Sequence, residues 1–425
     1  MEMKAPRGTH DIMPDQSGAW QIVEEMIRRR CRSNGFDEIR TPIFEQTGVF
    51  ARGVGDTTDI VQKEMYTFED KGGRSMTLRP ENTAGVVRAF LEHRLYAGPM
   101  PVKLYYLSAP MFRYENPQSG RYRQFHQFGV EVFGAPDASC DAEVIALAWG
   151  LLKDLGVEKL ALHINSIGCP KCRAAYQEML KAHFNAHLDE LCETCHDRLE
   201  RNPLRILDCK IDADKPFMKE APHIIDHLCE ECQTHLENLK KYLATAGIPY
   251  TIDPMIVRGL DYYTKTVFEV VSEDIGAQGT VCGGGRYDGL MRLMGGPELP
   301  GVGFAFGMER LLMVMDALGI MPEDDNTTDV YIASMPEEEA RQAAFRLCLA
   351  MRAEGLRADV DHVQRSLKAQ MKYAGKSNVH LMIVIGQDEL ETGKITVRDM
   401  RTKEERQTTM DAAVGTVLSM AEGEE

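Results

Sequence analysis

The segment MFRYENPQSGRYRQFHQFGVEVFG, residues 111–134, has the pattern from which the fold can be inferred. Aromatic and β-branched residues flank the turn-rich segment ENPQSGR, so we expect residues 102–133 to form two strands joined at this tip. Side chains alternate along a strand, which places one set of residues of the second strand on a common face: Phe125, Gln127, Gly129, Glu131 and Phe133. His126 falls between these positions and is expected to point the other way.

Arg113 and Glu115 share one face of the opposite strand. The two strands would then bring an arginine, two acids, a glutamine and aromatic rings to one surface. A face buried only for packing would be mainly aliphatic, and a face in contact only with water would not need the aromatic rings. We therefore interpret this surface as a binding cleft.

The segments before the hairpin predict helices and a strand around it. Residues 18–34 place apolar side chains at helical spacing, and Gly35 should end that helix. Residues 37–43 read as a strand. Residues 80–97 read as a helix opened by a proline and an acid.

The segments after the hairpin form three regions that differ in composition and in secondary-structure pattern. Residues 168–246 are charged, helical in pattern and rich in cysteine, which indicates an inserted subdomain, whereas residues 250–316 return to strands and glycine-rich turns. A polar linker follows at 321–328, and strand–helix alternation then predicts a compact α/β domain of about 100 residues. We expect domains at 1–325 and 329–425.

Composition limits the class of protein. A chain of 425 residues with 44% hydrophobic and 27% charged residues is expected to form two or three soluble domains. It contains no run of about 20 apolar residues, and its first residues lack a secretory pattern, so we expect a cytoplasmic protein that does not enter a membrane. The net charge of −16 argues against unspecific coating of nucleic acid but leaves room for a local basic path.

The common nucleotide-binding motifs are missing from the sequence. It has no GxxxxGK[ST] loop, and GVGFAFG at 301–307 has the wrong spacing for GxGxxG. The glycine triplet 283–285 would by itself indicate only a flexible turn. These observations exclude a P-loop and argue against a dinucleotide fold.

Taken together, six segments resemble the histidyl-tRNA synthetases, a family of class II aminoacyl-tRNA synthetases. The segments that resemble the three class II motifs are FDEIRTPIFEQTGVF (36–50), the strand–loop–strand segment 111–134 and GVGFAFGMERLLM (301–313). VRGLDYYTKTVFEV (257–270) and GTVCGGGRYDGL (279–290) are similar to two histidine-specific segments, and LRPENTAG (78–85) is similar to the substrate loop. The resemblance runs from PRGTHD (6–11) to the last expected helix.

The resemblance implies an α+β fold: a mixed, mostly antiparallel sheet with flanking helices, a helical insertion and a C-terminal α/β anticodon-binding domain. It implies ATP-dependent ligation of L-histidine to its tRNA through a histidyl-adenylate, with release of AMP and pyrophosphate. It also implies a homodimer, since motif 1 lies at a dimer interface in class II enzymes.

The resemblance further implies roles for individual residues. Arginine suits the phosphate contacts because its donors match phosphate geometry. The catalytic residues would be Arg113 at the α-phosphate and the carboxylate, Arg258 at the α-phosphate, and Arg310 at the γ-phosphate. The other ATP contacts would be Phe125 stacked on adenine, Glu115 accepting from the adenine amino group, and Mg²⁺ on the leaving phosphates. The histidine site would contain Glu81 and Tyr263 at the ring, Thr83, Gln127 and Glu131 at the amino group, and Arg113, Arg258 and Tyr262 beside them.

Two groups of residues are candidates for tRNA contacts. Arg365, Lys368, Lys372 and Lys376 have helical spacing, which would place them on one helix face. The alternative is an ordinary solvated face. By resemblance, the tip residues Gln118, Arg121 and Arg123 would face the acceptor end of the tRNA.

The cysteines of the insertion leave a question open. Three CxxC pairs and one more cysteine predict a structural zinc site, with the alternative of reduced thiols: Cys169, Cys172, Cys192, Cys195, Cys209, Cys229 and Cys232. The 19 residues between Cys172 and Cys192 fit a four-thiolate zinc template. Seven donors do not divide into fours, so the pairing stays ambiguous.

Three other functions are alternatives to histidine ligation. Regulatory subunits of ATP phosphoribosyltransferase resemble the same family but lack the anticodon domain and much of the ATP machinery. A zinc-dependent nucleic-acid-binding module with a degenerate core is another alternative, and a class II enzyme of different specificity is a third. Arg113, Glu115, Arg258, Arg310 and the C-terminal domain favour the histidyl enzyme.

Overall fold

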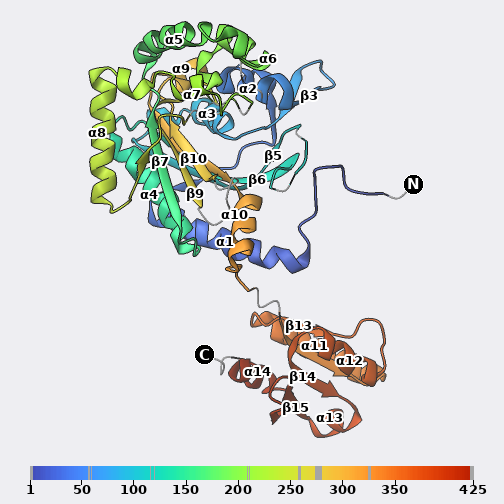
Figure 1. Ribbon diagram of the computed structural model, residues 1–425. Helices are drawn as coiled ribbons and strands as arrows, with labels where there is room; N and C mark the ends of the chain where they lie inside the picture. The colour runs from blue at the N-terminus through green and yellow to red at the C-terminus, as the bar shows by residue number, and fades with distance from the viewer. Residues whose placement is uncertain are drawn as a thin grey trace. The chain divides into compact units, whose positions relative to one another are not determined.

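The computed structural model describes residues 3–55, 58, 60–114, 116–118, 120–207, 209, 211–256, 260–272, 280–323 and 327–421. The chain divides into two compact units, Met1–Glu323 and Asp324–Glu425 (Figure 1). Across the described residues, every helix is too short or too polar to span a bilayer.

The first unit is built on a large mixed sheet. Along the sheet the strands are β1 (Asp37–Glu38), β5 (Val102–Phe112), β6 (Gln124–Phe133), β11 (Gly301–Gly307), β10 (Thr280–Arg286), β9 (Thr264–Ser272), β7 (Leu160–Ser166) and β8 (Thr251–Ile252). The two outermost pairs are parallel, and the other pairs are antiparallel. The predicted α+β class with a mostly antiparallel sheet is confirmed.

The predicted hairpin is confirmed and lies within this sheet. β5 and β6 pair in an antiparallel register that joins Phe112 to Gln124 and Val102 to Phe133. Beyond the strands, the backbone N–H of Arg113 donates to the carbonyl oxygen of Arg123 over 2.9 Å. The strands therefore hold the first residues of the tip in the same ladder.

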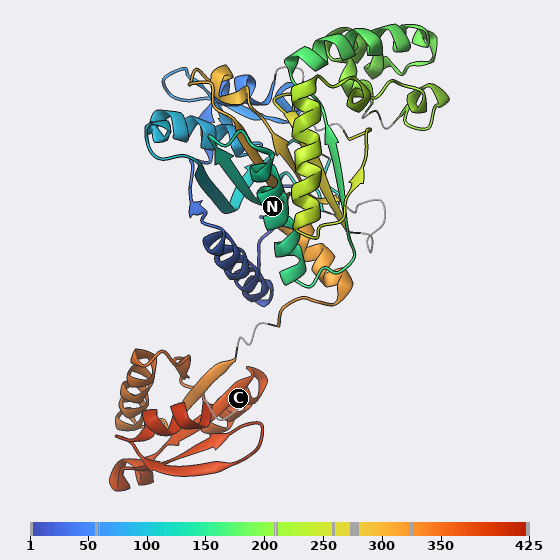
Figure 2. The ribbon, with the colours of Figure 1, turned by 90° about the vertical axis from the view of Figure 1, so that its left-hand side faces the viewer.

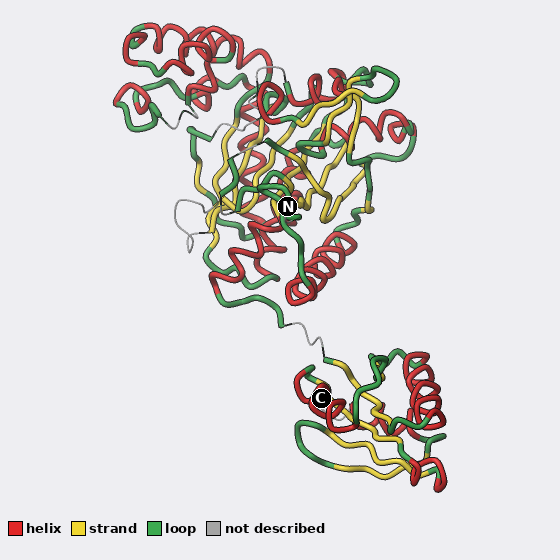
Figure 3. Tube along the Cα trace, turned by 90° about the vertical axis from the view of Figure 1, so that its right-hand side faces the viewer, coloured by secondary structure: helices red, strands yellow, loops and turns green. Residues whose placement is uncertain are grey.

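Helices cover both faces of the sheet, which appears as the yellow strands within red helices in Figure 3. The helices of this unit are α1 (Pro14–Ser33), α2 (Thr47–Val54), α3 (Thr83–Glu92), α4 (Ala138–Asp154), α5 (Pro170–Asn185), α6 (Glu193–Arg201), α7 (Pro216–Lys219), α8 (Glu230–Thr245), α9 (Leu290–Leu293) and α10 (Met308–Leu318). Residues of α1, α4, α8 and α10 share one apolar core with the sheet. Residues of α3 and α9 share a second core with residues of β5 and β9.

Two predicted elements have different boundaries. The strand expected at 37–43 is split, because the chain leaves the main sheet after Ile39, passes Pro42 and joins a small antiparallel sheet at Phe44. That small sheet has the order β2 (Phe44–Gln46), β4 (Ser75–Leu78) and β3 (Tyr66–Glu69). The helix expected at 80–97 is shorter, because Glu81 caps its start and Arg94 adopts a left-handed φ of 53° after its end.

The insertion is helical, as its pattern predicts. Residues of α5, α6 and α7 and of the turns between them form a separate apolar core. The last helix, α8, instead packs Leu236, Leu239 and Leu243 into the core of the main sheet. Figure 2 shows α5 to α7 in green at one end of the unit and α8 running alongside the sheet. The insertion therefore leaves from the end of one strand of the sheet and returns into its core.

The second unit is an α/β fold with its own core. Its strands, in sheet order, are β13 (Ala358–Val360), β12 (Thr328–Ser334), β14 (Val379–Ile385), β15 (Lys394–Asp399) and β16 (Glu405–Thr409). Its helices are α11 (Glu338–Ala353), α12 (Leu367–Lys376), α13 (Gln387–Thr392) and α14 (Ala413–Ala421). The predicted strand–helix alternation is confirmed, whereas β16 and α13 were not predicted because their segments are short and polar.

Candidate active site

A cavity opens on the sheet face that α3 covers. Its lining residues come from α3, the β5–β6 hairpin, the segment before β9, and β10 and β11: Glu81, Thr83, Tyr106, Arg113, Gln127, Glu131, Leu260, Tyr262, Tyr263, Gly283, Tyr287, Gly303, Phe304 and Ala305. Its cavity volume is about 100 Å³, enough for a small polar group to enter. Every described residue of the predicted histidine site lines this cavity.

Glu131 lines the cavity and is 1% exposed. Its Oε1 accepts from the Thr83 hydroxyl over 2.6 Å, and its Oε2 accepts from the Tyr287 hydroxyl. Burial raises the pKa of the Glu131 carboxyl to about 8, although these two hydroxyl groups act in the opposite direction. Burial therefore favours the protonated carboxyl, and a bound cation would favour its ionised form.

Glu81 is the second buried acid of the cavity. Its two oxygens accept from the backbone N–H groups of Thr83 and Ala84 over 2.8 and 3.0 Å, at the start of α3. Burial raises its pKa, against the opposing effect of these N–H groups. The helix start thus fixes the orientation of the carboxylate while the cavity keeps it out of water.

Gln127 supplies an unsatisfied polar atom to the cavity. Its buried Oε1 has no hydrogen-bond partner among the described residues. A buried acceptor left alone costs about 1–3 kcal/mol. A ligand that donates to this oxygen would remove that cost.

Glycines make room for these side chains. A Cβ at Gly303 in β11 would lie 2.2 Å from Oε2 of Glu131 and 2.2 Å from the carbonyl oxygen of Val130. A Cβ at Gly129 in β6 would lie 2.3 Å from the hydroxyl of Tyr106. The glycine-rich pattern of 301–307 is therefore a steric requirement of the cavity.

Arg286, in the GGGRYDG segment, stabilises the frame around the cavity and does not line it. The guanidinium is fully buried and binds Asp141 of α4 through Nε at 3.1 Å, and Asp288 and the carbonyl oxygen of Ala135 through Nη1. Burial would raise the pKa of Asp141, but hydrogen bonds from His235 and Arg286 lower it to about 2. This ion pair fixes β10 and the neighbouring Tyr287 against α4.

Arg113 directly follows β5, and Phe125 lies in β6. The Arg113 guanidinium lies 5.5 Å from the centre of the Phe125 ring, and its Nε donates to the carbonyl oxygen of Pro80 over 2.9 Å. Arg113 lines the cavity, whereas Phe125 is not among its lining residues. The pair therefore offers a cation inside the cavity and a ring face next to it.

Arg310 lies in the first turn of α10 and does not line the cavity. Burial lowers the pKa of Arg310, and the neighbouring positive charge of Arg121 lowers it further. The negative charge of Glu269 acts in the opposite direction. Glu115 and Arg258, predicted to contact ATP and the α-phosphate, lie outside the described residues.

His126 points away from the cavity, as the strand alternation predicts. Its backbone N–H donates to both carboxylate oxygens of Glu309 in α10, and its Nδ1 lies 2.8 Å from Oε1 of the same carboxylate. Its ring meets Trp20 of α1 edge-on at 5.3 Å. These contacts attach the hairpin to α1 and α10.

The predicted tRNA residues fall into different environments. Gln118 and Arg121 are exposed at the tip and pair through their backbones, whereas the Arg123 guanidinium lies 4.3 Å from the centre of the Tyr114 ring. Lys368, Lys372 and Lys376 are exposed on α12.

The prediction that Arg365 shares this helix face is wrong. It precedes α12, its Nη1 binds Asp361 over 2.7 Å, and its guanidinium lies over Tyr373. Spacing alone could not show that Ser366 starts the helix after it.

The seven cysteines of the insertion form two clusters, with a pairing that differs from the expected template. Cys169 and Cys172 meet Cys229 and Cys232, not Cys192 and Cys195. The second cluster contains Cys192, Cys195, Cys209 and Asp212. The sequence analysis missed Asp212, although the spacing of Cys209 and Asp212 equals that of each CxxC pair and could have revealed it.

Tyr106 and Tyr287 are further lining residues that the sequence analysis missed. Tyr106 lies in the middle of β5 and is read there as a core aromatic, and Tyr287 follows the buried Arg286. The signal for Tyr287 was its place within GGGRYDG. Nothing in the pattern of β5 marked Tyr106.

Comparisons with known proteins agree over nearly the whole chain. The family model "Histidyl-tRNA synthetase" matches residues 8–311, and the model "Anticodon binding domain" matches residues 329–420. A histidine–tRNA ligase of Caldanaerobacter subterraneus subsp. tengcongensis is 54% identical over 97% of this chain and 98% of its own length. A histidine–tRNA ligase of Clostridioides difficile is 51% identical over 95% and 96%.

Solved structures show the same similarity. The apo histidyl-tRNA synthetase of S. aureus has a TM-score of 0.84 at 42% identity and covers 98% of this chain and 100% of its own. An ATP phosphoribosyltransferase regulatory subunit/histidyl-tRNA synthetase from Bacillus halodurans has a TM-score of 0.61 at 22% identity, covers 91% and 98%, and shows the shared fold alone. The match over residues 8–311 and the identity along the whole chain establish that this chain belongs to the histidyl-tRNA synthetase family.

Proposed function

We propose that this chain joins L-histidine to its tRNA with ATP and that the cavity is where the histidyl-adenylate forms, with release of pyrophosphate and later of AMP. The observation that carries this proposal is the chemistry of the cavity. Two buried acids, Glu81 and Glu131, lie in one small cavity with Arg113. Histidine brings a cationic amino group, a neutral ring with one donor and one acceptor, and a carboxylate, which these groups complement.

Each part of histidine has a partner in this proposal. Glu131, Thr83 and Gln127 bind the amino group, whose charge ionises Glu131 and whose N–H groups satisfy Oε1 of Gln127. Glu81 and Tyr263 read the ring, and Tyr262 packs beside Tyr263 with ring centres 4.7 Å apart. A buried polar pair discriminates strongly, because a ligand without matching groups leaves both partners unsatisfied.

The ATP site continues from the cavity toward α10. Arg113 binds the α-phosphate and the histidine carboxylate, Arg310 binds the γ-phosphate, and adenine stacks on Phe125. Glu115 and Arg258 complete the set by resemblance. ATP enters with Mg²⁺, which neutralises charge on the leaving phosphates. The protein contributes position and positive charge, because attack of the carboxylate on the α-phosphate accumulates negative charge on oxygen.

Exchange of pyrophosphate into ATP tests the proposal directly. The assay is run with each of the twenty amino acids in turn, using the full chain. Exchange with histidine alone supports both activation and specificity. No exchange with histidine, or equal exchange with several amino acids, contradicts the proposal.

The regulatory-subunit alternative predicts histidine binding without exchange. The anticodon-binding match at residues 329–420 and the identity of 54% along the whole chain argue against it. The tRNA then meets the chain at two places in our proposal. Gln118, Arg121 and Arg123 contact the acceptor end, whose single-stranded bases can be read on their edges. The lysines of α12 contact the backbone of the anticodon arm.

We also propose that the chain works as a homodimer in the cytoplasm. Ile43 and Phe44 beside Pro42 are 45% and 47% exposed, and the exposed Phe68 lies 6.3 Å from Phe44, ring centre to ring centre. Paired apolar rings on a surface mark an interface. Light scattering should give twice the chain mass, and Phe44→Glu should give a monomer. A monomeric wild-type protein would contradict the dimer. Absence of the protein from the soluble cytoplasmic fraction of cells would contradict the proposed location.

A structural zinc in the insertion accompanies this proposal but takes no part in the reaction. None of the seven cysteines is among the residues that line the cavity. In the reducing cytoplasm their thiols stay available as ligands.

A further inference from the structure

Among its described residues, the insertion carries two separate groups of side chains that could bind a metal ion. In each group the four donor atoms lie within 4.8 Å of one another. The first group, cluster A, contains Cys169, Cys172, Cys229 and Cys232; the second, cluster B, contains Cys192, Cys195, Cys209 and Asp212. We infer that this chain binds two zinc ions, one in each cluster. Cluster B fixes the arm of the insertion formed by α6 and the turn Pro203–Ile206, and this arm contacts the segment that carries Tyr262 and Tyr263.

The sulfur positions fit a single metal ion in each cluster. Sγ of Cys169 lies 3.7 Å from that of Cys172 and 3.8 Å from that of Cys229, and Sγ of Cys192 lies 3.7 Å from that of Cys209. A tetrahedron with zinc–sulfur bonds of about 2.3 Å has edges of about 3.8 Å. A disulfide would require about 2.0 Å. The thiols therefore stand at the separation of ligands on one tetrahedral ion.

The backbone supports the sulfur ligands. The N–H of Cys229 donates to Sγ of Cys172 over 3.1 Å, and the N–H of Asp212 donates to Sγ of Cys209 over 3.4 Å. Such contacts to coordinating atoms stabilise their negative charge and set their orientation. Cys172 and Cys232 are buried, at 3% and 0% exposure. Thiols that are buried together in this way favour a metal ion that all of them bind.

Asp212 takes the place of the eighth cysteine. It follows Cys209 at the spacing of a CxxC pair and is fully buried. Its Oδ2 accepts from the backbone N–H of Cys192 over 3.0 Å, and its Oδ1 lies 2.8 Å from Nζ of Lys215. Carboxylate oxygen is an accepted zinc ligand, and the lysine offsets part of the negative charge of three thiolates and a carboxylate.

Cluster A fastens the start of the insertion to its end. Cys169 immediately precedes α5, and Cys229 immediately precedes α8, which packs into the core of the main sheet. Four ligands from these two places close a segment of 60 residues, counted from Cys169 to Cys229. Closing a long segment restricts the unfolded chain most, so this ion should stabilise the insertion as a whole.

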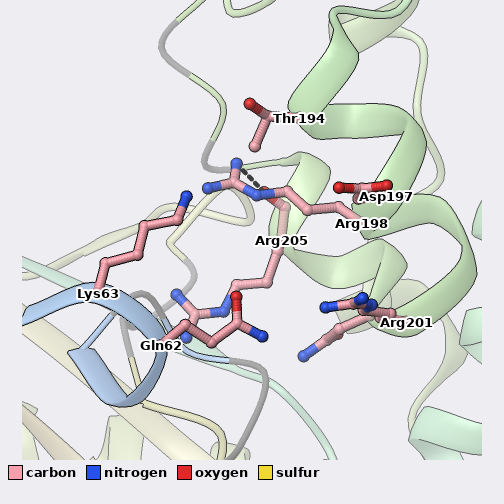
Figure 4. A pocket seen from close by; sticks show the side chains of 8 residues that line it. Gln62, Lys63, Thr194, Asp197, Arg198, Arg201 and Arg205 are labelled. Carbon is pink, nitrogen blue, oxygen red and sulfur yellow. Dashed lines mark hydrogen bonds between the residues drawn. The ribbon is translucent and has the colours of Figure 1, made fainter.

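Cluster B holds the arm formed by α6 and the turn Pro203–Ile206. Arg205 and Asn202 of this arm reach Oδ1 of Asp261 at 3.3 and 3.2 Å. Asp261 directly precedes Tyr262 and Tyr263, which line the cavity. Figure 4 shows Arg198, Arg201 and Arg205 of the arm opposite Gln62 and Lys63 of the main body, with Nη1 of Arg198 bonded to the carbonyl oxygen of Arg205. The arm is thus fixed by its metal ligands at one end and by Asp261 at the other.

Arg173 links cluster A to the same aspartate. It follows Cys172 directly, and its Nη1 lies 3.5 Å from the carbonyl oxygen of Asp261. Loss of either ion should therefore loosen the segment that carries Tyr262 and Tyr263. This part of the inference rests on the proposed function, whereas the presence of two ions does not.

Metal analysis of the full chain tests the two sites. Protein purified without chelator should contain two zinc ions per chain by plasma mass spectrometry, one for each cluster. Cys229→Ala and Cys192→Ala should each contain one, and Cys140→Ala, which removes a buried thiol of α4, should keep two. No zinc in the wild type, one ion per chain, iron in place of zinc, or two ions in Cys192→Ala overturns the inference.

A measurement on the wild type covers the case in which a variant does not fold. The full chain reconstituted with Co²⁺ should show absorption bands of tetrahedral cobalt and of cobalt–thiolate bonds, titrating to two ions per chain. Bands of octahedral cobalt, or an end point at one ion, contradict the assignment. Asp212→Asn should weaken the second ion alone.

The coupling is tested by the kinetics of pyrophosphate exchange. Cys192→Ala should raise the KM for histidine on the order of tenfold and change the KM for ATP by less than about twofold. Asp261→Asn should also raise the KM for histidine, while the protein keeps both zinc ions. Equal KM values for histidine in Cys192→Ala and Cys140→Ala would overturn the coupling. Wild-type protein with two zinc ions and no exchange would contradict the proposed function and leave the metal sites intact.

Discussion

The cavity and the cysteine clusters assemble their polar groups in opposite ways. In the cavity, Glu81 and Glu131 come from segments 50 residues apart in the chain, and the sheet brings them together around Thr83 and Tyr287. In the insertion, the two members of each pair of candidate ligands lie three positions apart in the sequence. The fold decides only which pair meets which other pair. Local spacing therefore indicates candidate metal ligands, whereas the residues of a candidate substrate site are recognised only when several distant segments are considered together.

This difference predicts different consequences of substitution. A change in the cavity should alter histidine activation and leave zinc content unchanged. A change in the clusters should alter zinc content first and activation second.

The largest expected effect is that of Glu81→Gln. We expect kcat/KM for histidine to fall on the order of 10³-fold, because the ring loses an anionic acceptor in a site that excludes water. Pyrophosphate exchange measures the effect. Glu92→Gln, at the exposed end of the same helix, is the matched control and should stay within about twofold of the wild type. A loss in Glu81→Gln that appears only in the KM for ATP would contradict the role in ring recognition.

The next effect in size is that of Gly303→Ala. The new methyl group would meet Glu131 and the carbonyl oxygen of Val130, so we expect a loss of roughly 100-fold in histidine activation and of about 1–3 kcal/mol in the free energy of unfolding. Exchange kinetics and denaturant unfolding measure the two effects. Gly289→Ala serves as the control, because a Cβ there meets no atom within 4 Å. Normal histidine kinetics in Gly303→Ala would show that Glu131 does not need its observed position.

The smallest expected effect on the cavity is that of replacing Lys368, Lys372 and Lys376 together by alanine. We expect unchanged pyrophosphate exchange and a rise of roughly tenfold in the KM for tRNA, with a weaker dependence of that KM on salt. Aminoacylation assays at two salt concentrations measure it. Arg365→Ala should instead lower the stability of the second unit, since it loses the Asp361 ion pair. Equal tRNA kinetics in the triple variant would identify the lysines as a solvated face.

The sequence predicted the sheet and the hairpin, and the described candidates for the histidine site line one cavity, because the family motifs fall on strands that meet there. It did not predict that Arg286 is a buried structural ion pair, since a GGGRYDG segment says nothing about Asp141 in a distant helix. It misplaced Arg365, because helical spacing does not reveal where a helix starts. It left the cysteines unpaired, because three pairs of equal spacing are equivalent until the fold separates them.

The most direct test of the cavity is the number of protons released when histidine binds. Burial raises the pKa of Glu131 to about 8, which favours the protonated carboxyl at pH 7, and the amino group of histidine should displace that proton. Calorimetry at pH 7 in two buffers of different ionisation enthalpy should show release of about one proton per chain in the wild type. It should show almost none in Glu131→Gln, together with weaker binding. Equal proton release and equal affinity in the two proteins would contradict the account of Glu131 as the partner of the histidine amino group.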